Sequence, residues 1–462
     1  MHARPFAAPE VRPADEFEQE GSLLPYTVSF ISLGCAKNQV NCEQMMASVS
    51  AAGHTVVAQP EGAAVVVVNT CGFLTSANEE AIDNILQMAE LKKAGQVKKI
   101  LVTGCMAQRY KEDVLTELPE VDGILGTGSY GDIVQAVEEV MADHRPARFG
   151  NIHTAPQDGP RILSTPPWYA YLRIAEGCDN HCAYCVIPSL RGKYRSRPMD
   201  ELLKEARELA DAGVKELLVI AQDITRYGTD LSGEHQLAAL LRELCKLDFH
   251  WIRLHYLYPD EITDELIDTI ASEPKILKYI DLPIQHCNDT ILKAMNRRDT
   301  KAELTELLAK LRSRIPGLVL RTSIITGLPY EDEAAFEELC EFLRETRIER
   351  AGVFPFSPEE GTRAAQMDHV PTEEAVRRAE LLVDVQSEII DGFNESRQGQ
   401  VLEVLCEGFD GQAQMFFGRS YAESPDIDGR IYFTAQEDPE IGTFVSVRVT
   451  GVMDGELTGE RV

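Results

Sequence analysis

Apolar runs and amphipathic stretches alternate through the first third of the chain. Residues 63–70 form a continuous apolar run, which is typical of a strand buried on both faces. Strand patterns fall at residues 27–34, 63–70 and 98–104, and residues 121–128 close the domain together with the last helical pattern. Helical patterns fall at residues 37–53, 76–95 and 130–142. This alternation predicts an α/β domain with a mostly parallel sheet over residues 26–143.

A second alternating region follows a stretch that contains several prolines and glycines. Its strand patterns fall at residues 169–177, 216–224, 250–257, 278–285, 318–327 and 350–357. Helical patterns separate them at residues 199–213, 261–274, 300–315 and 331–346. Six β/α units over roughly 230 residues predict a partial (β/α)6 barrel, with a doubly wound sheet as the alternative.

The C-terminal part of the chain has short β patterns separated by turn residues, after a long helical pattern at residues 371–397. Such spacing predicts a small all-β barrel. The predicted organisation is therefore a flexible extension at 1–25, an α/β domain at 26–143, a linker at 144–165, the partial barrel at 166–396 and the β-barrel at 397–462.

Composition narrows the classes of function. The chain of 462 residues carries a formal net charge of −30, so on average it repels nucleic acid. Its 11 cysteines are odd in number and widely spread, unlike a secreted disulfide framework. No secretion signal or membrane-length apolar run is visible, and we expect a cytoplasmic protein with metal-binding or catalytic cysteines.

Cys178, Cys182 and Cys185 form a C-x3-C-x2-C motif directly after a predicted strand. Iron–sulfur clusters usually take four cysteines, so three thiolates on one loop leave one iron open. An open iron can chelate the amine and carboxylate of a methionine moiety. The alternative is structural zinc, which needs four ligands; His181 could be the fourth in principle but lies within the same short loop.

Cys35, Cys71 and Cys105 each follow a predicted strand of the first domain. Ligands gather at the carboxyl ends of parallel strands, so these three thiols can converge and hold a second cluster. Each is next to a glycine: Gly34, Gly72 and Gly104. The alternative is three small buried residues, because free cysteine is often buried. The other cysteines are expected to be structural: Cys42, Cys245, Cys287, Cys340 and Cys406.

Four segments, SLGCAKN, VVNTCGF, VTGCMAQRY and GCDNHCAYC, together resemble the methylthiotransferase family of radical S-adenosylmethionine enzymes. The resemblance runs from about residue 26 to the C-terminus and implies a cluster domain, a partial barrel and a TRAM domain. It also implies two [4Fe-4S] clusters and S-adenosylmethionine as cofactors. One cluster would be held by Cys178, Cys182 and Cys185, and the auxiliary cluster by Cys35, Cys71 and Cys105.

Members of this family modify either an adenosine of transfer RNA or an aspartate of small-subunit ribosomal protein S-twelve. Segments such as LHYLYPDEITDEL and EPKILKYIDLPIQH resemble the ribosomal-protein branch, although Ala36 and Cys42 stand where proline and serine are expected. Residues 397–462 contain five Arg, no Lys and twelve Asp plus Glu, which predicts a poor phosphate binder. The basic segment 191–197 is the counter-argument for RNA, although we interpret it as a polar loop of the barrel.

Further candidates lie at the ends of predicted barrel strands, where the active sites of barrels gather. Gln222, Asp223, Gln285 and His286 end such strands, whereas Arg321 starts one and Tyr184 lies just before Cys185. Contacts with S-adenosylmethionine or substrate are predicted for all six. The alternative for the strand-end residues is that they make ordinary hydrogen bonds at the edge of the barrel. The expected partners are ribosomal protein S-twelve or the small ribosomal subunit and an electron donor, without a membrane or transfer RNA. We expect the chain to be a monomer.

Overall fold

The computed structural model describes residues 25–156 and 158–462, so the predicted extension lies almost wholly outside the described residues. The chain divides into two compact units. The first comprises the chain up to Pro166 together with Ala175–His181 and Cys185–Glu201. The second comprises Pro167–Ile174, Cys182–Tyr184 and Leu202–Val462. The loop that carries C-x3-C-x2-C therefore contributes residues to both.

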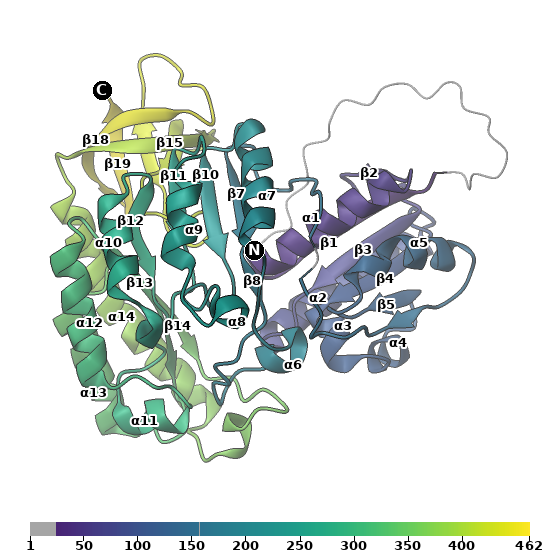
Figure 1. Ribbon diagram of the computed structural model, residues 1–462, viewed down its shortest axis with the longest axis horizontal. Helices are drawn as coiled ribbons and strands as arrows, with labels where there is room; N and C mark the ends of the chain where they lie inside the picture. The colour runs from purple at the N-terminus through teal and green to yellow at the C-terminus, as the bar shows by residue number, and fades with distance from the viewer. Residues whose placement is uncertain (1–24, 157) are drawn as a thin grey trace. The chain divides into compact units, whose positions relative to one another are not determined.

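A parallel sheet forms the centre of the first unit, with strand order β2-β1-β3-β4-β5-β6 in its described part (Figure 1). The strands are β1 (Thr27–Ser32), β2 (Thr55–Val57), β3 (Val65–Thr70), β4 (Lys99–Gly104), β5 (Gly123–Leu125) and β6 (Ala147–Arg148). The helices are α1 (Ala36–Ala51), α2 (Thr75–Lys93), α3 (Cys105–Tyr110), α4 (Asp113–Glu117), η1 (Tyr130–Asp132), α5 (Ile133–Met141) and α6 (Ile187–Arg191), and a short ribbon pairs β8 (Ala175–Glu176) with β9 (Arg195–Ser196).

Strand β3 is buried on both faces, as its apolar run predicts. Val65 and Val67 pack with apolar residues of α1 and α5, whereas Val66 and Val68 pack with those of α2 and α3. This division follows from the alternation of side chains along a strand. Strand β6 falls inside the predicted linker. It has only two residues, which are too few to give a strand pattern in the sequence.

The second unit contains a parallel sheet of order β14-β13-β12-β11-β10-β7 within its described residues, which confirms the partial barrel. Its strands are β7 (Tyr169–Arg173), β10 (Glu216–Ile220), β11 (Trp251–Leu254), β12 (Ile276–Asp281), β13 (Val319–Thr326) and β14 (Arg350–Pro355). Its helices are α7 (Met199–Asp211), α8 (Thr229–Ser232), α9 (Leu237–Leu244), η2 (Pro259–Glu261), α10 (Asp264–Ser272), α11 (Asp289–Ala294), α12 (Lys301–Arg314), α13 (Glu333–Thr346) and η3 (Ala364–Gln366).

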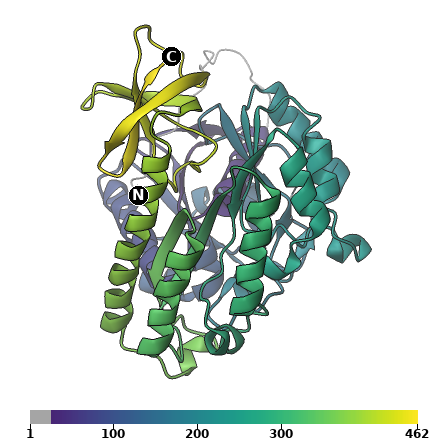
Figure 2. The same ribbon diagram turned by 90° about the vertical axis from the view of Figure 1, so that its left-hand side faces the viewer.

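The long helix α14 (Thr372–Ser396) packs against α13 and β14 and leads into a closed β-barrel (Figure 2). The described strands of this barrel are β15 (Val401–Asp410), β16 (Met415–Arg419), β17 (Ile431–Thr434), β18 (Phe444–Met453) and β19 (Glu456–Arg461). The sequence did not predict β19, because a glycine and several charged residues interrupt its apolar pattern. Closure of this barrel confirms the small all-β C-terminal part.

The C-terminal barrel contacts the strands of the partial barrel through buried ions. Glu216, the first residue of β10, accepts hydrogen bonds from Arg253 of β11 at 2.6 Å and from Arg419 of β16 at 2.7 Å. The three side chains are at most 2 % exposed. Arg419 also pairs with Glu407 at 2.8 Å, so two carboxylates balance two guanidiniums whose burial would otherwise be costly. This contact fixes the C-terminal barrel to the sheet.

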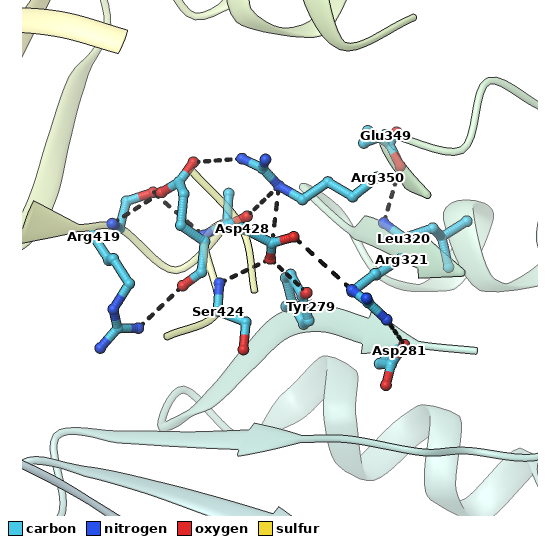
Figure 3. A network of polar contacts seen from close by, with 12 residues as sticks. Tyr279, Asp281, Leu320, Arg321, Glu349, Arg350, Arg419, Ser424 and Asp428 are labelled. Atoms are coloured by element: carbon cyan, nitrogen blue, oxygen red, sulfur yellow. Dashed lines mark hydrogen bonds and ion pairs between the residues drawn. The ribbon is translucent and has the colours of Figure 1, made fainter. Parts of the chain in front are cut away.

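A second set of contacts extends this attachment (Figure 3). Asp428 accepts a hydrogen bond from the Tyr279 hydroxyl at 2.6 Å and lies 3.9 Å from Arg321. Arg350 donates to Glu423 at 2.8 Å. Because β10 and β14 begin at Glu216 and Arg350, the C-terminal barrel covers the end of the sheet opposite the strand ends that carry the candidate site.

No described helix combines the length and the apolar character that crossing a membrane requires.

Replacement of Glu216 tests the buried ion triad. Burial opposes ionisation of this carboxyl group, but Arg419 and Arg253 outweigh burial and lower its pKa from 4.5 to about 2. Its contribution to stability is therefore full above pH 4.5 and is lost as the pH falls towards 2. E216Q should lower the free energy of unfolding by about 3 kcal/mol at neutral pH. It should also flatten the dependence of Tm on pH between 4.5 and 2, as measured by scanning calorimetry.

The matched control is E265Q, because Glu265 pairs with Arg242 at 2.7 Å on the exposed surface. Exposed pairs contribute little, so this change should cost less than about 1 kcal/mol. Equal losses of stability in the two variants would contradict the role given to the buried triad.

Candidate functional site

Three cysteines meet where three neighbouring strands of the first unit end. Cys35 lies directly before α1, Cys71 directly follows β3, and Cys105 is the first residue of α3 after β4. Strands β1, β3 and β4 are adjacent and parallel. The thiols lie close enough that Cys35 and Cys105 act electrostatically on Cys71. The structure therefore brings together all three of these predicted residues.

The glycines beside the cysteines allow this close approach. A Cβ atom on Gly34 would lie 2.6 Å from the Cβ of Cys71, and one on Gly104 would lie 2.4 Å from the carbonyl oxygen of Thr70. A Cβ on Gly72 would meet the backbone of Met106 at 2.7 Å. Gly34 and Gly104 also have φ values of +84° and +98°, which favour glycine. Any larger residue would separate the cysteines.

Buried amide and hydroxyl groups fasten the three strand ends to one another. The Asn38 amide donates to the carbonyl oxygens of Leu33 at 3.0 Å and Thr70 at 2.8 Å. The Asn69 amide donates to the carbonyl oxygen of Asn38 at 2.8 Å, and Thr103 donates to the Asn69 side chain at 3.1 Å. These bonds satisfy polar groups that would be costly to bury unpaired. They also hold the cysteine backbone in a fixed position.

The thiols occupy different electrostatic environments. Burial, followed by the charges of Cys35 and Cys105, raises the pKa of Cys71 to about 12. Burial also raises the pKa of Cys105, although Arg191 opposes it. Desolvation by the surrounding protein opposes ionisation of Cys35. The positive charges of Lys37 and Arg191 nevertheless hold the pKa of this thiol below its ordinary value. Three thiolates together would repel one another, so a cationic group between them would bind tightly.

The donor set fits an iron–sulfur cluster. Among the described residues, no group of three or more His, Cys, Asp or Glu side chains is arranged to hold a single metal ion. Cysteines that bind a [4Fe-4S] cluster each bind a different iron, and such clusters take thiolates. Cys35, Cys71 and Cys105 supply three thiols, which is the chemistry that such a cluster requires.

Arg191 is the charged neighbour of these cysteines. Its guanidinium donates to the Sγ of Cys105 at 3.4 Å and to the Asn38 side chain. It also donates to Asn41 at 2.8 Å and to Glu176 at 3.2 Å. Only 3 % of Arg191 is exposed. The first arginine of the basic segment 191–197 therefore lies buried beside the cysteines and is not part of an exposed basic patch.

The second set of cysteines lies on the loop between β8 and α6. Cys178, Cys182 and Cys185 are half-buried, and the backbone amide of Cys178 donates to the carbonyl oxygen of Gly192 at 3.1 Å. Within the second unit, the Sγ of Cys182 lies 3.8 Å from the Tyr258 hydroxyl. The guanidinium of Arg297 stacks on the Tyr258 ring, 4.1 Å from its centre. A buried cation thus lies near this cysteine as well.

The other candidates lie at several places in the second unit. Gln222 and Asp223 follow β10, and the Asp223 carboxylate accepts a hydrogen bond from the amide of Thr225 at 3.0 Å. Gln285 pairs with Ile324 of β13 and has a φ of +69°. These three positions lie beyond or along the carboxyl halves of their strands. Their contacts with a cofactor stay a prediction.

His286, Arg321 and Tyr184 differ in their surroundings. His286 is fully buried and lies 3.2 Å from Glu331. Arg321 pairs with Asp281 at 2.8 Å and lies beside Asp428 of the C-terminal barrel. Tyr184 packs in an apolar cluster around Ala183 and Met295. Arg321 thus contacts the carboxylates that attach the C-terminal barrel, whereas the ligand contacts predicted for these three residues stay untested.

Sequence reasoning missed Asn38, Asn69, Arg191, Tyr258 and Arg297. The first two carried a signal, because Asn38 lies three residues after Cys35 and Asn69 two residues before Cys71. Arg191 lies six residues after Cys185, in the basic segment whose pattern predicts a polar loop of the barrel. Tyr258 and Arg297 lie far from Cys182 in the sequence, so only the fold reveals them.

Comparisons with known proteins match all three parts of the chain. Residues 27–126 match the uncharacterized protein family UPF0004, residues 172–343 the radical SAM superfamily, and residues 399–462 the TRAM domain. Two solved structures of the radical S-adenosylmethionine methyltransferase TsrM from Kitasatospora setae share the fold at 12% identity. The one with cobalamin and a [4Fe-4S] cluster bound has a TM-score of 0.54 and covers 82% of this chain and 81% of that chain. The one with tryptophan and a SAM analog bound has a TM-score of 0.52 and covers 71% and 72%.

Curated relatives match nearly the whole chain and carry the name ribosomal protein uS12 methylthiotransferase RimO. The relative from Lachnoclostridium phytofermentans is 46% identical over 94% of this chain and 99% of its own length. Those from Clostridioides difficile and Symbiobacterium thermophilum are 44% and 45% identical over 94% of this chain and cover 98% and 91% of their own lengths. Cysteines at three converging strand ends, a C-x3-C-x2-C loop, a partial barrel and a TRAM domain agree with this similarity: the chain belongs to the RimO family of radical SAM methylthiotransferases.

Proposed function

We propose that this chain transfers a methylthio group to the β-carbon of an aspartate in ribosomal protein uS12, the small-subunit protein S-twelve. The observation that carries the proposal is the convergence of Cys35, Cys71 and Cys105 at three neighbouring strand ends. The names of the relatives support the substrate. The reaction would take place in the cytoplasm and requires an electron donor.

Two [4Fe-4S] clusters and S-adenosylmethionine are the cofactors in this proposal. Cys178, Cys182 and Cys185 would hold the cluster that binds S-adenosylmethionine. The cluster and S-adenosylmethionine together would supply the one-electron chemistry that activates a C–H bond. Cys35, Cys71 and Cys105 would hold the auxiliary cluster. Tyr258 and Arg297 surround Cys182 with a hydroxyl group and a cation, which stabilise a thiolate ligand.

Charge on the TRAM domain supports a basic protein as substrate. Of the five arginines in residues 397–462, two form buried ion pairs: Arg397 with Glu423, and Arg419 with Glu216. Its acidic residues, by contrast, largely face solvent. The exposed ones include Glu403, Asp426, Glu437, Asp438, Glu440, Asp454 and Glu460. A surface of this sign attracts a basic ribosomal protein and repels phosphate.

The basic segment 191–197 does not favour transfer RNA. Arg191 and Arg197 are at most 3 % exposed and pair with Glu176 and Asp158. Arg195 donates to the backbone carbonyl of Arg191 at 3.1 Å. Among the described basic residues of this segment, only Lys193 is exposed. A phosphate-binding surface needs several exposed cations, and this segment supplies one.

Iron content tests the two-cluster proposal. After anaerobic reconstitution the chain should hold about eight irons. Both C35A/C71A/C105A and C178A/C182A/C185A should hold about four, because each triple change removes one cluster. C42A is the matched control, since Cys42 is also a cysteine of the first unit but packs in its apolar core. It should keep about eight irons. Unchanged iron in C35A/C71A/C105A would contradict the proposal.

Product analysis by mass spectrometry tests the substrate. The reconstituted chain, given reductant, sulfide and S-adenosylmethionine, should place one methylthio group on an aspartate-containing peptide of uS12 and none on transfer RNA. E437K/D438K/E440K should weaken binding of uS12 about tenfold, which is about 1.4 kcal/mol. This loss should shrink as salt is added, because salt screens exposed charges.

The matched control for this charge reversal is E380K/D384K/E388K on the exposed face of α14, which changes the net charge by the same amount. It should leave the affinity for uS12 within about twofold. A methylthio group found only on an adenosine would overturn the substrate assignment and leave the cluster proposal in place.

A further inference from the structure

Arg191 is a buried cation whose guanidinium reaches a cysteine of the auxiliary site. It ends the short helix α6, which begins two residues after Cys185. One terminal nitrogen donates to the Asn41 side chain and to Glu176, and the other donates to the Asn38 side chain and to the Sγ of Cys105. Acceptors on both sides fix the plane of the guanidinium.

Glu176 balances the charge of Arg191 through one terminal nitrogen, and the other terminal nitrogen can donate to Cys105. A buried cation is costly unless it is paired, and Glu176, 3.2 Å away and itself 6 % exposed, supplies the balancing charge. The geometry then directs the second nitrogen to Cys105 at 3.4 Å. Cys35 also experiences the charge of Arg191. Cys71 experiences it as well, so one guanidinium acts on all three thiols.

Helix α6 packs beside Cys105 within the first unit. Its neighbour Val186 and its residue Leu190 pack with Cys105 and Phe73 in one apolar cluster. This packing holds the segment that follows Cys185 against the strand end at Cys105. Arg191 is placed by the same packing, so its position depends on the helix and on the asparagines of α1 together.

We propose that Arg191 is a positioning residue for the auxiliary cluster, where its guanidinium holds the Cys105 sulfur and raises the reduction potential of the cluster. The inference rests on the proposed function, because it requires a cluster at Cys35, Cys71 and Cys105. Hydrogen bonds to ligand sulfurs and nearby positive charge both favour the reduced, more negative cluster. Lysine, with a point charge and no planar fork, would reproduce the charge but not the full set of bonds.

The test uses the full-length chain with C178A/C182A/C185A, so that the auxiliary cluster alone is present. The cluster is titrated with dithionite in the presence of redox mediators, and its one-electron reduction is followed by electron paramagnetic resonance. R191Q in this background should lower the ratio of reduced to oxidised cluster about tenfold at a fixed solution potential, which is about 59 mV for one electron. R191K should recover most of this shift, with about four irons retained.

The matched control is R350Q, which removes another buried arginine that pairs with Glu423, a residue of the C-terminal barrel. It should leave the potential of the cluster unchanged. An equal shift in R350Q, or an unchanged potential in R191Q, would overturn the inference and leave the proposed function intact. Loss of iron in both R191Q and R191K would show that Arg191 is needed only for folding of the site, and this result would also overturn the inference. If the background chain itself binds no iron, the proposed auxiliary cluster fails, and the inference fails with it.

Discussion

The close approach of three parallel strand ends is the constraint on which the rest of the site depends. Cys35, Cys71 and Cys105 are separated by more than thirty residues in sequence and meet because β1, β3 and β4 are adjacent and parallel. Glycines beside the cysteines remove the Cβ atoms that would keep the strand ends apart. Buried amides then fasten the ends to one another. The site is thus a property of the sheet and does not depend on any one loop.

Buried ions have two different uses in this chain. Around Glu216 they attach the TRAM domain to the strands of the partial barrel. Glu407 also pairs with Arg419, so two carboxylates balance two guanidiniums there. Around Arg191 one of the donors faces a cysteine sulfur instead of a carboxylate. Removing one partner of a buried pair leaves an uncompensated charge in both places. The ions around Glu216 stabilise the fold, whereas Arg191 places a cation where a bound cluster would carry negative charge.

Much of the fold could be predicted from the sequence, because most strands of the partial barrel are bounded by turn residues and followed by an amphipathic helix. The short strands β2 and β6 and the polar strand β19 could not, since their pairing is decided by neighbours far away in the sequence. The cysteines were visible by their spacing and their glycines. Arg191 was not, because a basic residue in a basic segment is ordinarily solvated, and only the fold shows that Glu176 and Asn38 enclose it.

The most direct test of the central claim is anomalous diffraction at the iron edge from crystals of the chain reconstituted and grown without oxygen. If the chain holds two clusters, two separate iron peaks are expected. One of them should lie within bonding distance of the sulfurs of Cys35, Cys71 and Cys105, with the Arg191 guanidinium against Cys105. A single peak at the loop of Cys178, Cys182 and Cys185, with the three strand-end thiols free of iron, would contradict it.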